Sequence, residues 1–222
     1  MTTPERFARV REVLDRRQPD LTVLLENVHK PHNFSAILRS CDAVGICEAH
    51  AITPTGDRPK LHNAVTSGAG KWLKVRSHDN IQHALGALKA EEFQVLAAHP
   101  AEGAIDYRQA DFTRPTAVLL GQEKDGVSVN AAAGADGWIV IPMFGMVPSL
   151  NVSVAAALIL FEAQRQRAAA GLYDRCRLDP EVYRRTLFEW AYPVLAERCR
   201  RHKVDYPELG EDGDLLGDVP RG

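Results

Sequence analysis

The stretch "IPMFGMVPSLNVSVAAALILFEAQRQR", Ile141 to Arg167, decides the fold, because an irregular segment leads directly into an apolar run. Gly145 and Pro148 predict a loop before this run. Ser149 or Asn151 can cap a helix that extends from Asn151 to Ala170 and ends at Gly171. We expect the helix to pack its residues from Val152 to Phe161 into a core.

Short apolar runs typical of buried strands recur upstream of this helix. They are Leu21–Val28, Ala49–Ile52, Trp72–Val75, Phe93–Ala97, Thr116–Leu120 and Trp138–Ile141. Helical segments fall between several of them, at Phe34–Val44, Ile81–Lys89 and Ser128–Ala133. This alternation predicts an α/β protein with a mostly parallel sheet flanked by helices.

The ends of the chain differ from its middle in composition. We expect a basic N-terminal helix over residues 1–19, a sheet domain over 20–172 and a basic helical extension over 173–203, with one helix from about Pro180 to His202. Residues 204–222 hold six acidic residues and one arginine among glycines and prolines, a composition that predicts disorder. From charge alone, the basic ends are either a phosphate-binding surface or ordinary solvated helix faces.

Composition and motifs exclude several classes of protein. The polar N-terminus is no signal peptide, and the longest apolar stretch is far shorter than the ~20 residues that span a bilayer, so we expect a soluble, cytoplasmic protein. Four cysteines without C-x-x-C spacing indicate reduced thiols. "SGAGKW" (67–72) fails the phosphate-loop pattern, because Val65 and Trp72 stand at required positions, and no G-x-G-x-x-G follows a strand. The "HKPH" pair (29–32) lacks further ligands, so no metal is expected.

Three segments that follow predicted strands carry polar residues where α/β proteins place their sites. The first holds Asn33, a possible cap for a helix from Phe34, and Arg39; the second presents Glu123 after Gly121. In the third, Ser149, Asn151 and Ser153 alternate with apolar residues, which one capping residue does not explain. A loop that offers backbone N–H and C=O groups beside apolar side chains suits a flat heterocycle such as adenine.

Together the three segments resemble the SPOUT class of S-adenosylmethionine-dependent RNA methyltransferases, and more narrowly the TrmH family of tRNA guanosine-18 2′-O-methyltransferases. The family's motifs appear in order as "NFSAILRSCDAVG" (33–45), "AVLLGQEKDGVS" (117–128) and "IPMFGMVPSLNVSVAAA" (141–157). The resemblance covers most of the chain and becomes loose after Asp174. It implies a sheet whose C-terminal segment threads a deep trefoil knot, and a homodimer with the active site at the subunit interface.

The resemblance also implies roles for single residues. The cofactor S-adenosylmethionine is expected to contact Ala98, Gly121, Ile141, Met146 and Leu150. The catalytic region is expected to comprise Asn33, Arg39, Glu123, Ser149 and Asn151. The family usually has threonine where this chain has Ala98. The change is harmless if the contact is through the main chain, and costs about 1 kcal/mol of affinity if it is through the hydroxyl.

The implied reaction is methyl transfer to a ribose 2′-OH. The family assigns proton removal to the arginine that matches Arg39; with a pKa above ~12, that side chain is better suited to bind a phosphate and stabilise the developing alkoxide. Arginines at both ends are expected to hold the tRNA backbone: Arg6, Arg9, Arg11, Arg16, Arg17, Arg165 and Arg175. Two alternatives stay open: a 2′-O-methyltransferase acting on rRNA or on another tRNA position, and an RNA-binding protein that has lost catalysis.

Overall fold

The computed structural model describes residues 2–28, 30–52, 71–122 and 126–216. The chain forms two compact units, one of residues 18–172 and one that joins residues 1–17 to residues 173–222. Within the described ranges, no helix is long and apolar enough to cross a membrane. All four cysteines are free thiols.

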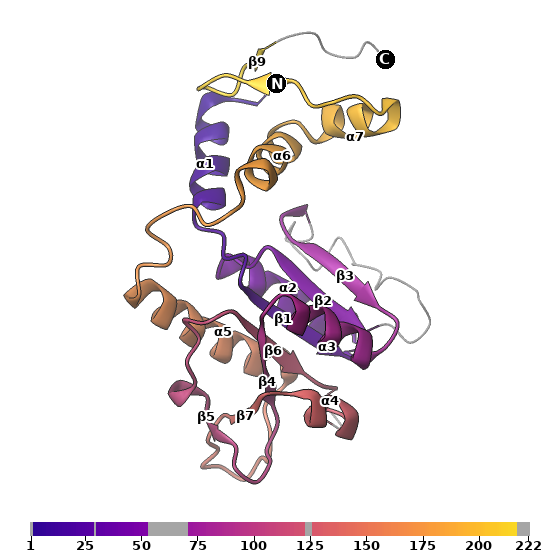
Figure 1. Cartoon of the computed structure of the whole chain (residues 1–222). Helices are drawn as coiled ribbons and strands as arrows, with labels where there is room; N and C mark the ends of the chain where they lie inside the picture. Colours follow the sequence, from indigo (N-terminus) through magenta and orange to yellow (C-terminus); the bar gives the residue numbers. More distant parts are fainter. Residues whose placement is uncertain (1, 29, 53–70, 123–125, 217–222) are drawn as a thin grey trace. The chain divides into compact units, whose positions relative to one another are not determined.

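The unit of residues 18–172 is built on a seven-stranded sheet in which every strand pairing is parallel (Figure 1). The strand order is β3-β2-β1-β6-β4-β7-β5. The strands are β1 (Leu21–Glu26), β2 (Glu48–Ile52), β3 (Lys74–His78), β4 (Gln94–Ala98), β5 (Ile105–Asp106), β6 (Thr116–Leu120) and β7 (Gly137–Val140). This confirms the predicted α/β class.

Helices cover both faces of the sheet. They are α2 (Pro31–Ala43), α3 (Ile81–Ala90), α4 (Val129–Gly134) and α5 (Val152–Ala169), with a 3-10 turn, η2 (Tyr107–Gln109). One core lies between the sheet and helices α2 and α5, and contains Val23, Ile37 and Ile159. The other lies under α3 and α4 and contains Leu24 and Leu88. Successive residues of a strand point to opposite faces of the sheet. Because a core covers each face, β1 is buried along its whole length.

Capping side chains fix several helix starts. Asn80 Oδ1 accepts from the His83 N–H at the start of α3, and Ser128 Oγ accepts from the Ala131 N–H at the start of α4. Asn151 is the N-cap of α5, as predicted. Such caps satisfy backbone donors that the first helical turn leaves unpaired.

Strand β3 differs from its predicted position, Trp72–Val75, because it runs from Lys74 to His78. Among the described strands it pairs with β2 alone and forms a polar edge, so its side chains are mostly exposed. A search for apolar runs misses such a strand, since pairing rather than burial defines it.

Helix α5 exposes more of its apolar surface than predicted. Val154, Leu158 and Phe161 are 47%, 41% and 49% exposed, so the expectation that the whole run from Val152 to Phe161 packs as core is wrong. Only Val152, Ala156, Ile159 and Leu160 in this run are buried. The exposed three recur at positions i, i+4 and i+7, which places them on one side of the helix.

A buried arginine holds the other end of α5. The Arg167 side chain is fully buried and forms an ion pair with Asp20. Its guanidinium also donates to Gln18 Oε1 at 2.9 Å and to the Phe112 carbonyl at 3.0 Å. These bonds join α5 to the chain just before β1 and to the loop before β6.

The second unit contains α1 (Pro4–Asp15), α6 (Pro180–Ala191), α7 (Pro193–His202), β8 (Glu208–Leu209) and β9 (Leu215–Leu216). Thr3 caps α1 and Pro4 begins it. The single helix expected from Pro180 to His202 is two helices, because Pro193 lacks an N–H and starts a new one.

The acidic tail is ordered as far as residue 216, so the prediction of disorder is wrong there; residues 217–222 lie outside the described part. Strands β8 and β9 pair antiparallel. Gly213, at the hairpin turn, has a φ of +87°, and a Cβ on it would lie 2.6 Å from the Phe7 ring. The Tyr192 hydroxyl donates to the Gly213 carbonyl at 2.7 Å. These contacts attach the tail to α1 and α6.

Candidate active site

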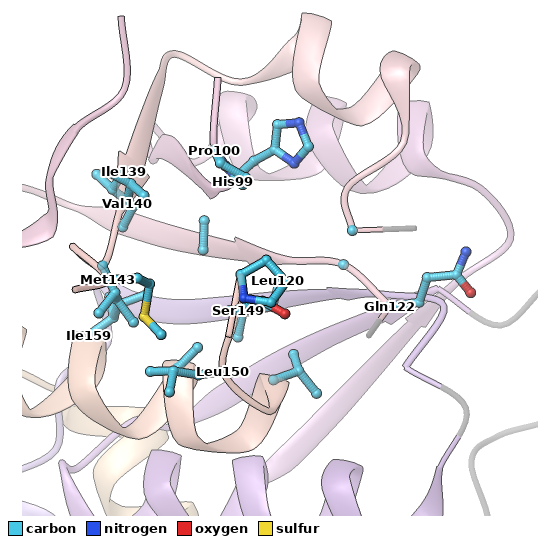
Figure 2. Close-up of a pocket in the computed structure, with 17 residues that line it drawn as sticks. His99, Pro100, Leu120, Gln122, Ile139, Val140, Met143, Ser149, Leu150 and Ile159 are labelled. Carbon is cyan, nitrogen blue, oxygen red and sulfur yellow. The ribbon is translucent and has the colours of Figure 1, made fainter. Parts of the chain in front are cut away.

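A pocket lies at the carboxyl ends of β4, β6 and β7, next to the segment that enters α5 (Figure 2). In parallel α/β sheets this edge is the usual location of ligand sites. The lining residues are Ala98, His99, Pro100, Leu120, Gly121, Gln122, Gly126, Ile139, Val140, Ile141, Met143, Pro148, Ser149, Leu150, Val152, Ala155 and Ile159. Most of these side chains are apolar, so the pocket favours a flat, largely apolar group.

One wall of the pocket is formed by Gly121, Gln122 and Gly126, the described residues of the turn after β6. The Gln122 N–H donates to the Gly126 carbonyl at 3.1 Å, and the Gly126 N–H donates back at 2.9 Å. A Cβ on Gly121 would lie 2.0 Å from the Gly126 oxygen, so only glycine fits there. Gly126 has a φ of +67°, which also favours glycine. The turn brings backbone polar groups close to the pocket.

The opposite wall is joined to α2 through two asparagines. The Asn151 side-chain amide donates to Asn33 Oδ1 at 3.2 Å. Asn151 Oδ1 accepts from the Ser153 N–H at 2.8 Å and so caps α5. Asn33 is 2% exposed and lies inside α2, whose N-cap is Lys30. The prediction that Asn33 caps a helix is therefore wrong, because Pro31 at the first helical position starts the helix earlier.

The structure brings most of the predicted cofactor residues together. Ala98, Gly121, Ile141 and Leu150 line the pocket, and Ser149 of the predicted catalytic set joins them. Met146 does not line it, and its side chain is fully exposed, as is that of Phe144.

Three other members of the predicted catalytic set, Asn33, Arg39 and Asn151, are not among the lining residues of the pocket. Arg39 is exposed on α2, and within the described part of the chain it makes no side-chain hydrogen bond or ion pair. Glu123 lies outside the described residues. A side-chain hydrogen bond connects two members of the predicted catalytic set, Asn33 and Asn151.

The sequence interpretation missed several lining residues. His99 and Pro100 follow β4, and Gln122 follows Gly121. Met143 also lines the pocket, whereas the sequence predicts a cofactor contact for Met146 in the same loop. Position directly after a buried strand was a usable signal for His99 and Gln122. Nothing in the sequence distinguishes the two methionines, since their directions depend on the path of the loop.

The pocket's residues fit S-adenosylmethionine. Apolar side chains such as Leu150 and Ile141 suit the faces of adenine. Gln122, Ser149 and His99 supply polar groups for the ligand's hydroxyl, amino and carboxylate groups. Within the described ranges, no group of three or more His, Cys, Asp or Glu side chains is arranged to hold a metal ion.

The predicted RNA-binding arginines differ in their surroundings. The exposed arginines Arg9 and Arg16 pair with Glu12, and the exposed Arg165 pairs with the half-buried Glu162. Arg6, Arg11 and Arg175 are also exposed. Arg17 is 1% exposed and its guanidinium lies 5.0 Å from the Trp190 ring centre, which contradicts its predicted contact with RNA.

Comparisons with known proteins agree with this geometry. The sequence model of the SpoU rRNA Methylase family matches residues 20–161, and that of the C-terminal region of SpoU rRNA methylases matches residues 165–218. The chain is 61% identical to a tRNA (guanosine(18)-2'-O)-methyltransferase of Thermus thermophilus over 85% of this chain and 96% of the relative. It is 49% identical to the protein of the same name from Escherichia coli over 97% and 95%. The sequence motifs predicted that the resemblance becomes loose after Asp174. The matches extend beyond this residue, so that prediction is wrong.

Solved structures give the same result. The crystal structure of the Aquifex aeolicus TrmH/SpoU tRNA modifying enzyme matches with a TM-score of 0.80 and 43% identity, over 85% of this chain and 96% of that one. An AdoMet-bound rRNA methyltransferase from Sinorhizobium meliloti matches with a TM-score of 0.58 and 28% identity, over 70% and 59%. The parallel sheet and the pocket beside α5 define a methyltransferase of the SPOUT class. Within that class, the chain belongs to the SpoU methylase family.

Proposed function

We propose that this protein transfers a methyl group from S-adenosylmethionine to the ribose 2′-OH of guanosine 18 in tRNA. The observation that carries the proposal is the convergence of two motifs on one pocket, with Gly121 on one wall and Ser149 and Leu150 on the other. The names of the two relatives that match almost end to end support the choice of nucleotide.

S-adenosylmethionine supplies an electrophilic methyl group. The protein's task is to place the hydroxyl in line with it, because orientation removes much of the barrier to such a transfer. Arg39 binds the phosphate next to the target ribose and stabilises the alkoxide that forms as the hydroxyl proton passes to that phosphate or to water, since a guanidinium stays charged and binds phosphate through paired hydrogen bonds. Asn33 and Asn151 hold the segment that carries Ser149, through the bond between their side chains. Glu123 completes the catalytic set by its place in the family motif.

Leu150 and Ile141 would hold the cofactor's adenine in the apolar part of the pocket. Ala98 lines the same pocket, where the family usually has threonine. A methyl group provides no hydrogen bond, so any polar contact at this position comes from the backbone. Met146 takes no part in one chain alone, because its side chain points to solvent.

The functional form is a homodimer whose active sites draw residues from both chains. Two exposed apolar groups adjoin the pocket: Phe144, Met146 and Val147 on the loop, and Val154, Leu158 and Phe161 on α5. Soluble monomers rarely expose so many large apolar side chains on connected segments. A second copy of the chain buries them, and also brings residues such as Arg39 near the partner's pocket.

Exposed arginines of the protein hold the tRNA backbone. Arg6, Arg11 and Arg175, together with the ion-paired Arg9, Arg16 and Arg165, contact its phosphates. A cytoplasmic location follows from a tRNA substrate. The segment from Ile141 to Leu150 forms the knotted loop implied by the resemblance, with α5 holding it in place.

A methyl-transfer assay tests the proposal. Purified protein is incubated with S-adenosylmethionine carrying a tritiated methyl group and with total tRNA or rRNA, and the labelled nucleotide is mapped. We expect label in tRNA at guanosine 18. Label only in rRNA or at another tRNA position supports a different member of the family, and binding of tRNA without any label indicates a non-catalytic RNA-binding protein.

A further inference from the structure

Strand β1 ends in a buried carboxylate, that of Glu26. Glu26 is 5% exposed, at the end of a strand that is otherwise apolar except for Thr22. Burying a carboxylate is costly unless hydrogen bonds replace its hydration. Within the described ranges, no cationic side chain lies within ion-pair distance of Glu26.

One serine satisfies both oxygens of this carboxylate. The Ser128 N–H donates to Glu26 Oε2 at 2.8 Å, and the Ser128 hydroxyl donates to Glu26 Oε1 at 2.6 Å. The same hydroxyl oxygen accepts from the Ala131 N–H at 3.2 Å and caps α4. The Glu26–Ser128 pair thus connects the end of β1 to the start of α4.

The pair lies at the end of the turn that forms one pocket wall. Leu25 of β1 pairs with Leu120 of β6, so Glu26 and Gly121 are the next residues on adjacent strands. Gly121, Gln122 and Gly126 line the pocket, and Ser128 follows two residues after Gly126. The sheet therefore fixes the first residue of the turn, and the Glu26–Ser128 pair fixes the chain just beyond its last one.

We infer that Glu26 is a positioning residue for cofactor binding and methyl transfer, and that it acts through Ser128 on the pocket-lining residues Gly121, Gln122 and Gly126. This inference rests on the proposed function for its kinetic part only. Hydrogen bonds to a charged group are stronger than those between neutral groups, so a carboxylate holds the turn better than an amide does.

A control variant on the same strand, Thr22→Val, distinguishes a positioning role of Glu26 from a purely structural one. Thr22, near the opposite end of β1, is also buried, and its hydroxyl donates to the Glu48 carbonyl at 2.6 Å. It lies far from the carboxyl ends that form the pocket. Thr22→Val removes a buried hydrogen bond of β1 without touching the turn.

The test compares Glu26→Ala, Glu26→Gln, Ser128→Ala, Ser128→Thr and Thr22→Val in the full chain, below the unfolding temperature of each variant. Calorimetry gives the Kd of S-adenosylhomocysteine, and steady-state assays give kcat and KM for tRNA. We expect Glu26→Ala and Ser128→Ala each to weaken binding about tenfold, the loss of one or two hydrogen bonds to a charged group. Ser128→Thr should bind normally and Glu26→Gln should be intermediate.

The double variant Glu26→Ala, Ser128→Ala should have a Kd for S-adenosylhomocysteine no higher than that of the single variant that binds more weakly, because the two residues act through one contact. Thr22→Val should lose thermal stability and keep normal binding. Equal binding by Glu26→Ala, Ser128→Ala and Thr22→Val overturns the inference, as do additive effects in the double variant. If the wild type binds S-adenosylhomocysteine with this pattern but methylates no tRNA, the proposed function fails and the positioning role stands.

Discussion

The side-chain amide of Asn151 donates a hydrogen bond to Oδ1 of Asn33 at 3.2 Å, although 118 positions separate the two residues. The bond ties α2 to the start of α5, and therefore to the loop that carries Ser149 and Leu150 into the pocket. Because Asn33 is 2% exposed, it acts on the site through Asn151 rather than by reaching solvent.

The change Asn151→Asp tests this link. Aspartate keeps the acceptor that caps α5 but replaces the donor, so two oxygens face each other across the contact. We expect methyl transfer to fall by at least about tenfold, the equivalent of 1.4 kcal/mol, with the helix retained. Asn80→Asp is the matched control, because Asn80 caps α3 away from the pocket. Equal turnover by the two variants in a single-turnover assay would contradict the link.

Arg39→Ala should separate chemistry from cofactor binding. Arg39 is exposed on α2 and outside the pocket lining, so its loss should leave the Kd of S-adenosylmethionine unchanged in calorimetry. Turnover should fall by at least about a hundredfold, since the charge that stabilises the alkoxide is removed. Arg76→Ala, which removes an exposed arginine paired with Glu48, serves as control. Near-normal turnover by Arg39→Ala would rule out its role.

The exposed apolar face of α5 predicts self-association. Phe161→Glu combined with Leu158→Glu places charges where a second copy should pack, and buried unpaired charges are strongly unfavourable. Light scattering should find a dimer for the wild type and a monomer for the double variant, with loss of methyl transfer. Glu162→Gln on the same helix is the control. A wild type that is monomeric and active would exclude the proposed shared site.

Arg167→Ala should destabilise the fold without acting on the site. The change removes the ion pair with Asp20 and the hydrogen bond to the Phe112 carbonyl from a buried region. We expect the free energy of unfolding in urea to fall by about 3 kcal/mol or more. Arg165→Ala removes an exposed ion pair two residues away and should cost less than about 1 kcal/mol. Similar losses for the two variants would contradict the buried clamp.

The sequence predicts well what depends on local pattern. The run from Leu21 is a strand because its residues are apolar on both faces, and Asn151 caps α5 because a short polar side chain precedes an apolar run. The sequence also contains a signal for the start of α2. Proline favours the first position of a helix, so Pro31 predicts a start before Asn33, the residue expected as the cap.

Contacts between distant residues could not be predicted. Strand β3 forms because β2 pairs with it, although its own residues are polar. The tail folds because Gly213 packs on Phe7, at the other end of the chain. The Glu26–Ser128 pair joins residues that are 102 positions apart. In the site, the motifs located the pocket, whereas the directions of single side chains such as Met143 and Met146 required the path of the loop.

The most direct test of the central claim uses two tRNA transcripts that differ in one atom. In the second transcript, guanosine 18 carries a 2′-deoxyribose, so the proposed acceptor oxygen is absent while the base and phosphates stay. We predict transfer of one tritiated methyl group per molecule to the first transcript and none to the second, with similar binding of both. Equal methylation of the two transcripts would contradict the assignment of the 2′-OH of guanosine 18 as the acceptor.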